Sequence, residues 1–372
     1  MKKTLLIILF WACFYTAGAQ NLKNEPGTEA RVIIHTKIEL KSLRGVSPVL
    51  WENNIYTSDS SGAVTCFDST GHIVWRNNLP AEIISEPLVT DGAVTVATVN
   101  GEIISLIAHT GEQLQSLGID DSISTNLTPI QYDGDKELFL PKESESRTAI
   151  VFGTSSGAIY CLDLETLQEY WRNNDLRGKI TQSPLIVKNK ILYTGSDGYL
   201  YSIDARNGLL NWRWKETEST DFSEAKLICD GKKVFVISND SQIYCIDLLL
   251  GKLLWKNDKF IILPEIGQSE DGKNLFVKTG DKRFFLMSAS NGVVLRQLKR
   301  PDDFDSLHVP PLEYNGNIYF TDKNSIYSLD NKLNEGLVFS SDDGWINIFR
   351  QVSETKFLAT TVSGTILIFG IR

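Results

Sequence analysis

The sequence predicts an all-β fold, an eight-bladed β-propeller with four antiparallel strands in each blade. A tight turn between two apolar strands recurs eight times along the 372 residues. The turns are Ser61-Gly62, Asn100-Gly101, Ser156-Gly157, Asp197-Gly198, Asp240-Ser241, Gly280-Asp281, Lys323-Asn324 and Ser363-Gly364. From one turn to the next, the spacings are 39, 56, 41, 43, 40, 43 and 40 residues. Repeats of this length that read as strand, turn and strand are typical of propeller blades.

The fourth repeat shows how one blade is built. Its strands are predicted at residues 183–187, 191–194, 199–203 and 209–214. Asp197-Gly198 supplies a two-residue hairpin turn between the second and third strands. Because neighbouring blades cover both faces of a blade, its strands should be apolar runs, and Ile191-Leu192-Tyr193 fits that expectation.

The remaining repeats align with the fourth. The first spans residues 48–79 and the fifth 225–258, and the others begin near residues 86, 128, 264, 310 and 345. The third is longer because of residues 133–147, whose composition is that of a solvated loop. We interpret that segment as a surface insertion, with a docking element as the alternative.

The last repeat ends at Arg372 after three strands. The otherwise unassigned segment 31–40 alternates apolar and polar residues. We therefore predict that it pairs with residues 364–371 as the fourth strand of the last blade, which closes the ring and leaves no open edge. Residues 20–372 then form a single propeller domain.

Residues 1–19 have the features of a signal peptide. Lys2-Lys3 precedes an apolar run at residues 5–14, and Ala17-Gly18-Ala19 is a small-residue cleavage site. We expect export, to the periplasm or the medium. Lipid anchoring at Cys13 is not expected, because Phe10-Trp11-Ala12 precedes it. No later apolar run is long enough for a transmembrane segment.

The net charge of −9, with a pI near 5.1 and no Lys/Arg-rich block, argues against nucleic acid or an anionic membrane surface as the main partner. We expect a monomer. Cys66, Cys161 and Cys245 stand at one equivalent repeat position, and so on separate blades, while Cys229 shares a blade with Cys245. We predict unpaired thiols, since equivalent positions on different blades are too far apart for a disulfide.

A recurring motif carries a family resemblance. Ile203-Asp204-Ala205-Arg206-Asn207-Gly208, followed by Trp212, resembles the PQQ-type propeller repeat, and copies of the motif end in Trp75, Trp171 and Trp255. The resemblance implies an eight-bladed propeller. It also implies one of two functions. Quinoprotein alcohol and sugar dehydrogenases share the repeat with non-enzymatic propellers, which include the periplasmic lipoprotein of the outer-membrane β-barrel assembly machinery.

The motif residues are interpreted as structural. Each Trp is expected to pack between blades, and each Asp to accept hydrogen bonds from the backbone of its turn. The positions are Trp75, Trp171, Trp212 and Trp255, with Asp68, Asp163, Asp204, Asp247 and Asp330. The second repeat departs from the pattern with Ile107 and Leu114-Gln115, and the sixth with Ser288.

No catalytic, cofactor-binding or metal-binding residue is predicted. The Cys-Cys pair of quinoprotein dehydrogenases is missing, and the four His residues are not clustered. The densest acidic group is Asp302, Asp303 and Asp305, interpreted as a solvated loop. His72 and His109 fall in predicted turns.

We therefore predict a non-catalytic exported propeller that acts as a protein interaction scaffold, with an envelope or extracellular protein as partner. Its binding surface is expected on the face that carries the loops joining consecutive blades, with the blade rims as a second candidate. The loop segments are residues 81–85, 118–126, 173–179, 216–223 and 299–308. The alternatives are a PQQ-dependent or polysaccharide-active enzyme, and a carbohydrate- or ligand-binding propeller.

Overall fold

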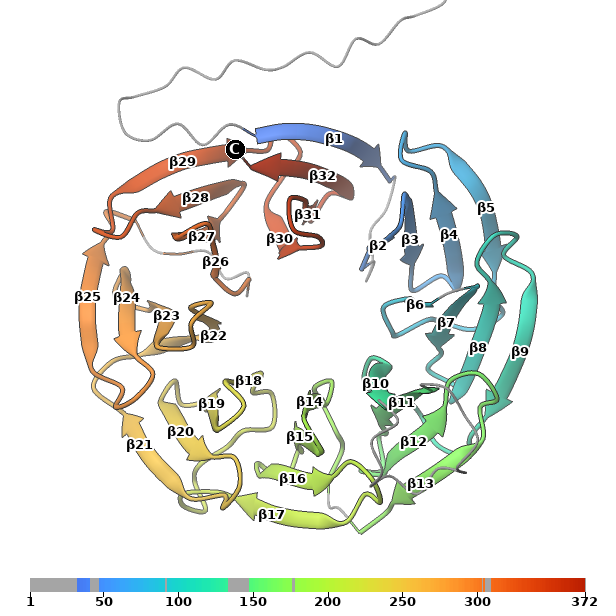
Figure 1. The fold of residues 1–372 in the computed structure, drawn as a ribbon, viewed down its shortest axis with the longest axis horizontal. Helices are drawn as coiled ribbons and strands as arrows, with labels where there is room; N and C mark the ends of the chain where they lie inside the picture. The colour runs from blue at the N-terminus through green and yellow to red at the C-terminus, as the bar shows by residue number, and fades with distance from the viewer. Residues whose placement is uncertain are drawn as a thin grey trace, which may run out of the picture.

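A computed structural model describes residues 32–40, 47–90, 92–132, 147–175, 178–302, 304 and 309–371. These residues form 32 strands, which assemble into eight four-stranded sheets. The sheets stand as blades around a central axis (Figure 1). The predicted eight-bladed propeller is therefore confirmed. In each of blades 1 to 7 the strands pair in chain order, so we name them A to D from the axis outward.

The strand bounds follow the repeat. Blades 1 to 4 contain β2 (Val49–Trp51), β3 (Asn54–Ser58), β4 (Ala63–Phe67), β5 (Ile73–Asn78), β6 (Leu88–Thr90), β7 (Ala93–Ala97), β8 (Glu102–Ile107), β9 (Gln113–Gly118), β10 (Thr128–Tyr132), β11 (Arg147–Gly153), β12 (Ile159–Asp163), β13 (Glu169–Asn173), β14 (Leu185–Val187), β15 (Lys190–Thr194), β16 (Leu200–Asp204) and β17 (Leu210–Trp214). Blades 5 to 8 contain β18 (Leu227–Cys229), β19 (Lys233–Ile237), β20 (Ile243–Asp247), β21 (Leu253–Asn257), β22 (Ile262–Gln268), β23 (Asn274–Thr279), β24 (Arg283–Ser288), β25 (Val294–Lys299), β26 (Leu312–Tyr314), β27 (Asn317–Asp322), β28 (Ser325–Leu329), β29 (Glu335–Ser340), β30 (Ile346–Gln351), β31 (Phe357–Thr361), β32 (Thr365–Ile371) and β1 (Val32–Glu39).

The ring closes as predicted. In blade 8 the strand order is β1-β32-β31-β30, so the first described strand is the outer strand of the last blade (Figure 1). Val32 pairs with Ile371 and Glu39 with Thr365, and the Leu40 amide donates a further hydrogen bond to the Gly364 carbonyl. The closing strand therefore spans Val32–Glu39, within the predicted segment.

The burial pattern explains why the inner strands are apolar runs. All five residues of β4 are buried, whereas only Trp75 is buried in the neighbouring outer strand β5. Inner strands lie between two neighbouring blades, while an outer strand keeps part of its surface in water. Ring closure and blade stacking together place the core between blades. One cluster, for example, joins Val64 and Cys66 of blade 1 to Val94 and Ile104 of blade 2.

The cysteines lie where the repeat places them. Cys66, Cys161 and Cys245 occupy the third strands β4, β12 and β20, and Cys229 ends β18. None of these four forms a disulfide in the described part of the chain. Two further expectations concern residues outside the described ranges, namely the signal peptide at residues 1–19 and nearly all of the insertion at 133–147.

Candidate functional site: interaction surfaces of the ring

Each repeat Trp reaches the next blade. The indole Nε1 of Trp75 donates a hydrogen bond of 2.8 Å to the Ala108 carbonyl, in the C–D turn of blade 2. The other three make the same bond to their own neighbours: Trp171 to Ala205 at 3.0 Å, Trp212 to Leu248 at 3.0 Å and Trp255 to Ala289 at 3.2 Å. The four Trp rings thus lie between neighbouring blades.

A glycine in the next turn makes room for each ring. Gly251 has φ +64°, and a Cβ built on it would stand 2.5 Å from Cδ2 and Cγ of Trp212. An L side chain would therefore be strained by the backbone and would also overlap the indole. Gly111, Gly208 and Gly292 stand in the same relation to Trp75, Trp171 and Trp255.

The repeat Asp residues hold these turns. Asp247 Oδ1 accepts hydrogen bonds from the amides of Leu249 and Leu250, at 2.9 and 2.7 Å. The other four repeat Asp side chains accept equivalent bonds from backbone amides that lie two to four residues later in the chain. These residues are Asp68, Asp163, Asp204 and Asp330. Such side-chain to backbone bonds stabilise the conformation of a turn, which is a structural role.

Sequence reasoning missed a third member of this set. Asn173 lies two residues after Trp171, and its Nδ2 donates 2.6 Å to the carbonyl of Gly208, on which that Trp packs. Asn77 and Asn257 bond Gly111 and Gly292 in the same way. The signal was available, because Trp-x-Asn recurs in three repeats, but blade 4 has Trp214 at that position.

The departures from the motif come in pairs. In blade 2, Gln115 stands at the Trp position, and in blade 3 Leu167, at φ 56°, replaces the glycine that a Trp would require. The Gln115 side chain still donates 2.8 Å to the Glu165 carbonyl of blade 3. Between blades 6 and 7, Arg296 and Leu333 (φ 64°) are the corresponding pair.

Arg296 stands at the Trp position between blades 6 and 7, and a buried ionic cluster stabilises this interface. The side chain of Arg300 is 8% exposed and bonds the carboxylates of Asp322 and Glu335, both in blade 7. Its guanidinium also lies 4.8 Å from the ring centroid of Tyr327. Arg300 belongs to the predicted loop 299–308, and its contacts are structural links between blades. Asp303, Asp305 and His308 lie outside the described residues.

The loops that join consecutive blades are tied to one another. We call the side of the ring that carries these D–A loops and the B–C turns the D–A face. On it, Asn126 Oδ1 accepts 2.9 Å from the Glu86 amide, and the Asn126 amide donates 3.2 Å to Ser183 Oγ. Ser124 Oγ donates 2.7 Å to the carbonyl of Ile180. These bonds therefore connect the described residues of the loops that enter blades 2, 3 and 4.

Two ion pairs continue this network. Arg350 of blade 8 bonds the Pro48 carbonyl at 2.6 Å and the Glu86 carboxylate at 3.0 Å, and so connects the closing blade to blades 1 and 2. Lys226, before blade 5, contacts Glu265 of blade 6 at 2.5 Å. Burial raises the pKa of the Glu265 carboxyl above its usual range, and Lys226 opposes that effect.

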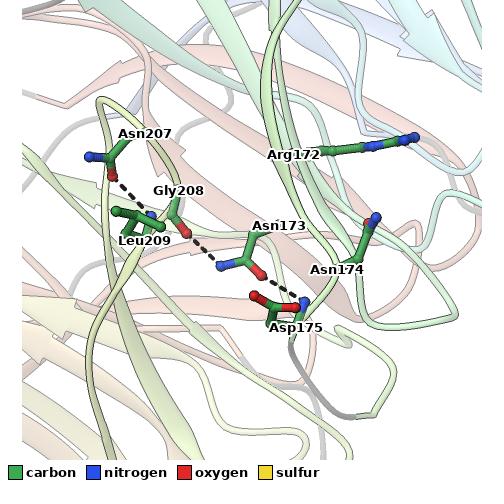
Figure 2. A pocket seen from close by; sticks show the side chains of 7 residues that line it. All are labelled: Arg172, Asn173, Asn174, Asp175, Asn207, Gly208 and Leu209. Carbon is green, nitrogen blue, oxygen red and sulfur yellow. Dashed lines mark hydrogen bonds between the residues drawn. The ribbon is translucent and has the colours of Figure 1, made fainter.

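A shallow hollow of about 250 Å³ lies between blades 3 and 4 (Figure 2). Its lining residues are Arg172, Asn173, Asn174, Asp175, Asn207, Gly208 and Leu209. Three bonds join lining residues: Asn173 donates to the Gly208 carbonyl and accepts from the Asp175 amide, and Asn207 accepts from the Leu209 amide at 3.0 Å. The hollow is therefore part of the interface between blades 3 and 4 at which Trp171 packs.

The described residues contain no group of three or more His, Cys, Asp or Glu side chains placed to hold a metal ion. His72 and His109 are exposed in C–D turns, as the sequence indicates. No helix in the described ranges is long and apolar enough to cross a membrane.

The repeat core matches one protein family. The family described as "outer membrane protein assembly factor BamB" matches residues 25–116 and 134–332. The chain belongs to this family. Named members are distant: BamB of Burkholderia pseudomallei is 27% identical over 218 residues, which are 53% of this chain and 51% of that protein. BamB of Kangiella koreensis is 21% identical over 295 residues, covering 66% and 72%.

The chain spans about half the length of the curated relatives from Burkholderia pseudomallei, Shewanella oneidensis and Yersinia pestis. Among solved structures, BamB from Moraxella catarrhalis superposes with a TM-score of 0.69 at 16% identity, covering 91% of this chain and 97% of that one. A quinohemoprotein alcohol dehydrogenase from Pseudomonas putida gives 0.65 at 12% identity, covering 91% and 76%. These structural likenesses show the shared propeller fold.

Proposed function

We propose that this protein is a non-catalytic, exported propeller that acts as a protein interaction scaffold in the assembly of outer-membrane proteins. The observation that carries the proposal is the family match, which extends over seven of the eight repeats. The relatives that bear a functional name are called outer membrane protein assembly factors. Residues 1–19 would direct export, so the partner would be a protein of the cell envelope.

The D–A face supports the proposal physically. In the described part of this face, Asn126, Ser124 and Arg350 bond residues of the loops that enter blades 1 to 4, so this part of the surface is ordered before any partner arrives. A surface that is already ordered loses less conformational entropy on binding. The repeat Trp and Asp residues would contribute by keeping the blades in register rather than by contacting a ligand.

The competing function is oxidation by a quinoprotein. The likeness to the quinohemoprotein enzyme is a likeness of fold, and one fold hosts many functions. No residue of the described chain specifically favours this function or a polysaccharide-active enzyme.

Deletion of the gene in the cells that produce the protein tests the proposal. Folded β-barrel proteins in the outer membrane should decrease, and the intact gene should restore them. Unchanged barrel content would contradict the assembly role. A parallel assay of the purified protein, reconstituted with PQQ and calcium, should show no dye-linked oxidation of alcohols or sugars. Measurable oxidation would instead establish an enzyme.

A further inference from the structure

The C–D turn of blade 5 differs from its counterparts in a way that the fold does not require. Blades 2 to 6 share one turn geometry, with two residues at its tip. In four blades the pair is polar, as His109-Thr110, Glu165-Thr166, Arg206-Asn207 and Ser290-Asn291. In blade 5 the pair is Leu249-Leu250, with exposed fractions of 70% and 59%. The backbone of this turn is capped by Asp247 in the usual manner, so the leucines serve no turn function.

These leucines head a larger apolar surface. The outer strands and turns of blades 4 and 5 expose six leucines, namely Leu209, Leu210, Leu249, Leu250, Leu253 and Leu254. The two blades are adjacent in Figure 1, and Trp212 connects them by packing on Gly251 in the same turn. We call these six residues the leucine patch. Exposed apolar groups gathered in this way mark an interaction site more often than scattered ones do.

Positive charge surrounds the patch. The A–B and C–D turns of blades 4 and 5 carry six cationic residues, which are Lys188, Lys190, Arg206, Lys232, Lys233 and Lys252. The same turns hold three carboxylates: Asp204 pairs with Arg206 at 2.6 Å, Asp230 lies 3.9 Å from Lys233, and Asp247 accepts backbone amides of its own turn. The six cations therefore exceed the carboxylates by three. Lys188 Nζ bonds the Gly231 carbonyl at 3.1 Å and so bridges the two blades. This region is thus locally cationic in a chain of net charge −9.

We propose that the leucine patch and its surrounding cations dock on an anionic lipid membrane, with Leu249 and Leu250 entering the interface. The two leucines project from the convex tip of a turn, which suits insertion between headgroups better than the grip of a concave protein groove. Lysine side chains beside them can reach lipid phosphates while their stems cover apolar surface. Each cation near an anionic surface adds to the electrostatic attraction. The excess negative charge of the chain, which gives it a net charge of −9, lies on residues outside these turns.

This proposal is independent of the assembly role and has its own test. All eight blades are completed by residues 32–371, so the chain from residue 20 can be examined without any lipid anchor. Purified protein is floated with vesicles of phosphatidylcholine that contain about one third phosphatidylglycerol, and with pure phosphatidylcholine vesicles. We expect flotation with the first vesicles, loss of most of it with the second, and weakening at high salt.

The decisive variant replaces the tip with that of blade 6, as Leu249→Ser with Leu250→Asn. The turn should fold unchanged, because Ser290-Asn291 occupies the same geometry, and partitioning should fall by at least about tenfold. Leu114→Ser is the matched control, a leucine with 56% exposure on blade 2 that should leave flotation unaltered. Melting temperatures check that each variant is folded.

The proposal is wrong if the wild-type protein does not float with anionic vesicles, and in that case the patch would be left for a protein partner. It is equally wrong if the double variant, shown to be folded, floats as well as the wild type, or if Leu114→Ser abolishes flotation to the same extent.

Discussion

The indole of Trp212 lies on the α-carbon of Gly251 in the next blade, and a Cβ on that glycine would stand 2.5 Å from the ring. The same Trp donates its Nε1 hydrogen bond to Leu248, three residues before the glycine. One side chain therefore meets both ends of a neighbouring turn, and the two positions constrain each other. Where the Trp is replaced by Gln115, the glycine is replaced as well, by Leu167.

Substitution of Gly251 should lower the unfolding free energy because the new side chain overlaps Trp212. A second glycine, which also has a positive φ but no such neighbour, is the control. Gly251→Ala and Gly316→Ala both place a Cβ at positive φ, at a cost of about 1 kcal/mol each. Only the first meets the Trp212 ring, since nothing lies within 4 Å of a Cβ at Gly316. Denaturant unfolding should show a further loss of about 1–3 kcal/mol for Gly251→Ala. Equal losses for the two variants would mean that the ring yields freely.

Ring closure gives a second prediction, with its control on the same strand. Ile38 is 5% exposed in β1, whereas Ile33 is 37% exposed. Ile38→Asp buries a charge at the closing seam and should lower the unfolding free energy by at least about 3 kcal/mol. Ile33→Asp should change it by less than about 1 kcal/mol. If both variants melt like the wild type, β1 does not hold the ring closed.

The thiols should be slow to react in the folded protein. Burial raises the pKa of Cys66 to about 11 and that of Cys245 to about 12. At pH 8 little thiolate is then present on either residue. Alkylation without reductant should be slow under native conditions, and mass spectrometry should find all four thiols of the mature chain labelled in denaturant. Two missing labels in denaturant would show a disulfide and a misplaced register.

Glu265 should give stability a specific pH dependence. Its pKa is raised in the folded state, mainly by burial, so the native protein binds the proton more tightly than the unfolded chain. This contribution makes the protein more stable as pH falls toward the ordinary value of 4.5, and less stable as pH rises above the folded pKa. The difference in unfolding free energy between Glu265→Gln and the wild type should therefore shift in favour of the wild type as pH falls from 7 toward 4.5. Glu218→Gln, at an exposed loop position, is the control and should track the wild type. If the difference in unfolding free energy between Glu265→Gln and the wild type does not change with pH, Glu265 does not have a raised pKa in the folded protein.

The sequence was sufficient for what repeats along the chain. The turns, the Trp and Asp positions and the closing strand all recur in register or fill a gap that the recurrence leaves. Contacts made only in space were not predictable. Arg300 meets Asp322 and Glu335 because two blades stack, and nothing in the spacing of these residues indicates it. The exposure of Leu249 was hidden by an apolar run that also contains the buried Leu248.

Site-specific photo-crosslinking in living cells tests the scaffold role most directly. The photoreactive residue is placed on the D–A face, at Glu82, Ser122 or Thr217, all exposed. Controls carry it on the opposite face, at Thr70 or Asn291, which are exposed in C–D turns. The D–A positions, and not the controls, should crosslink to a component of the outer-membrane protein assembly machinery. Crosslinks absent from every D–A position, in a protein that is exported and folded, would contradict it.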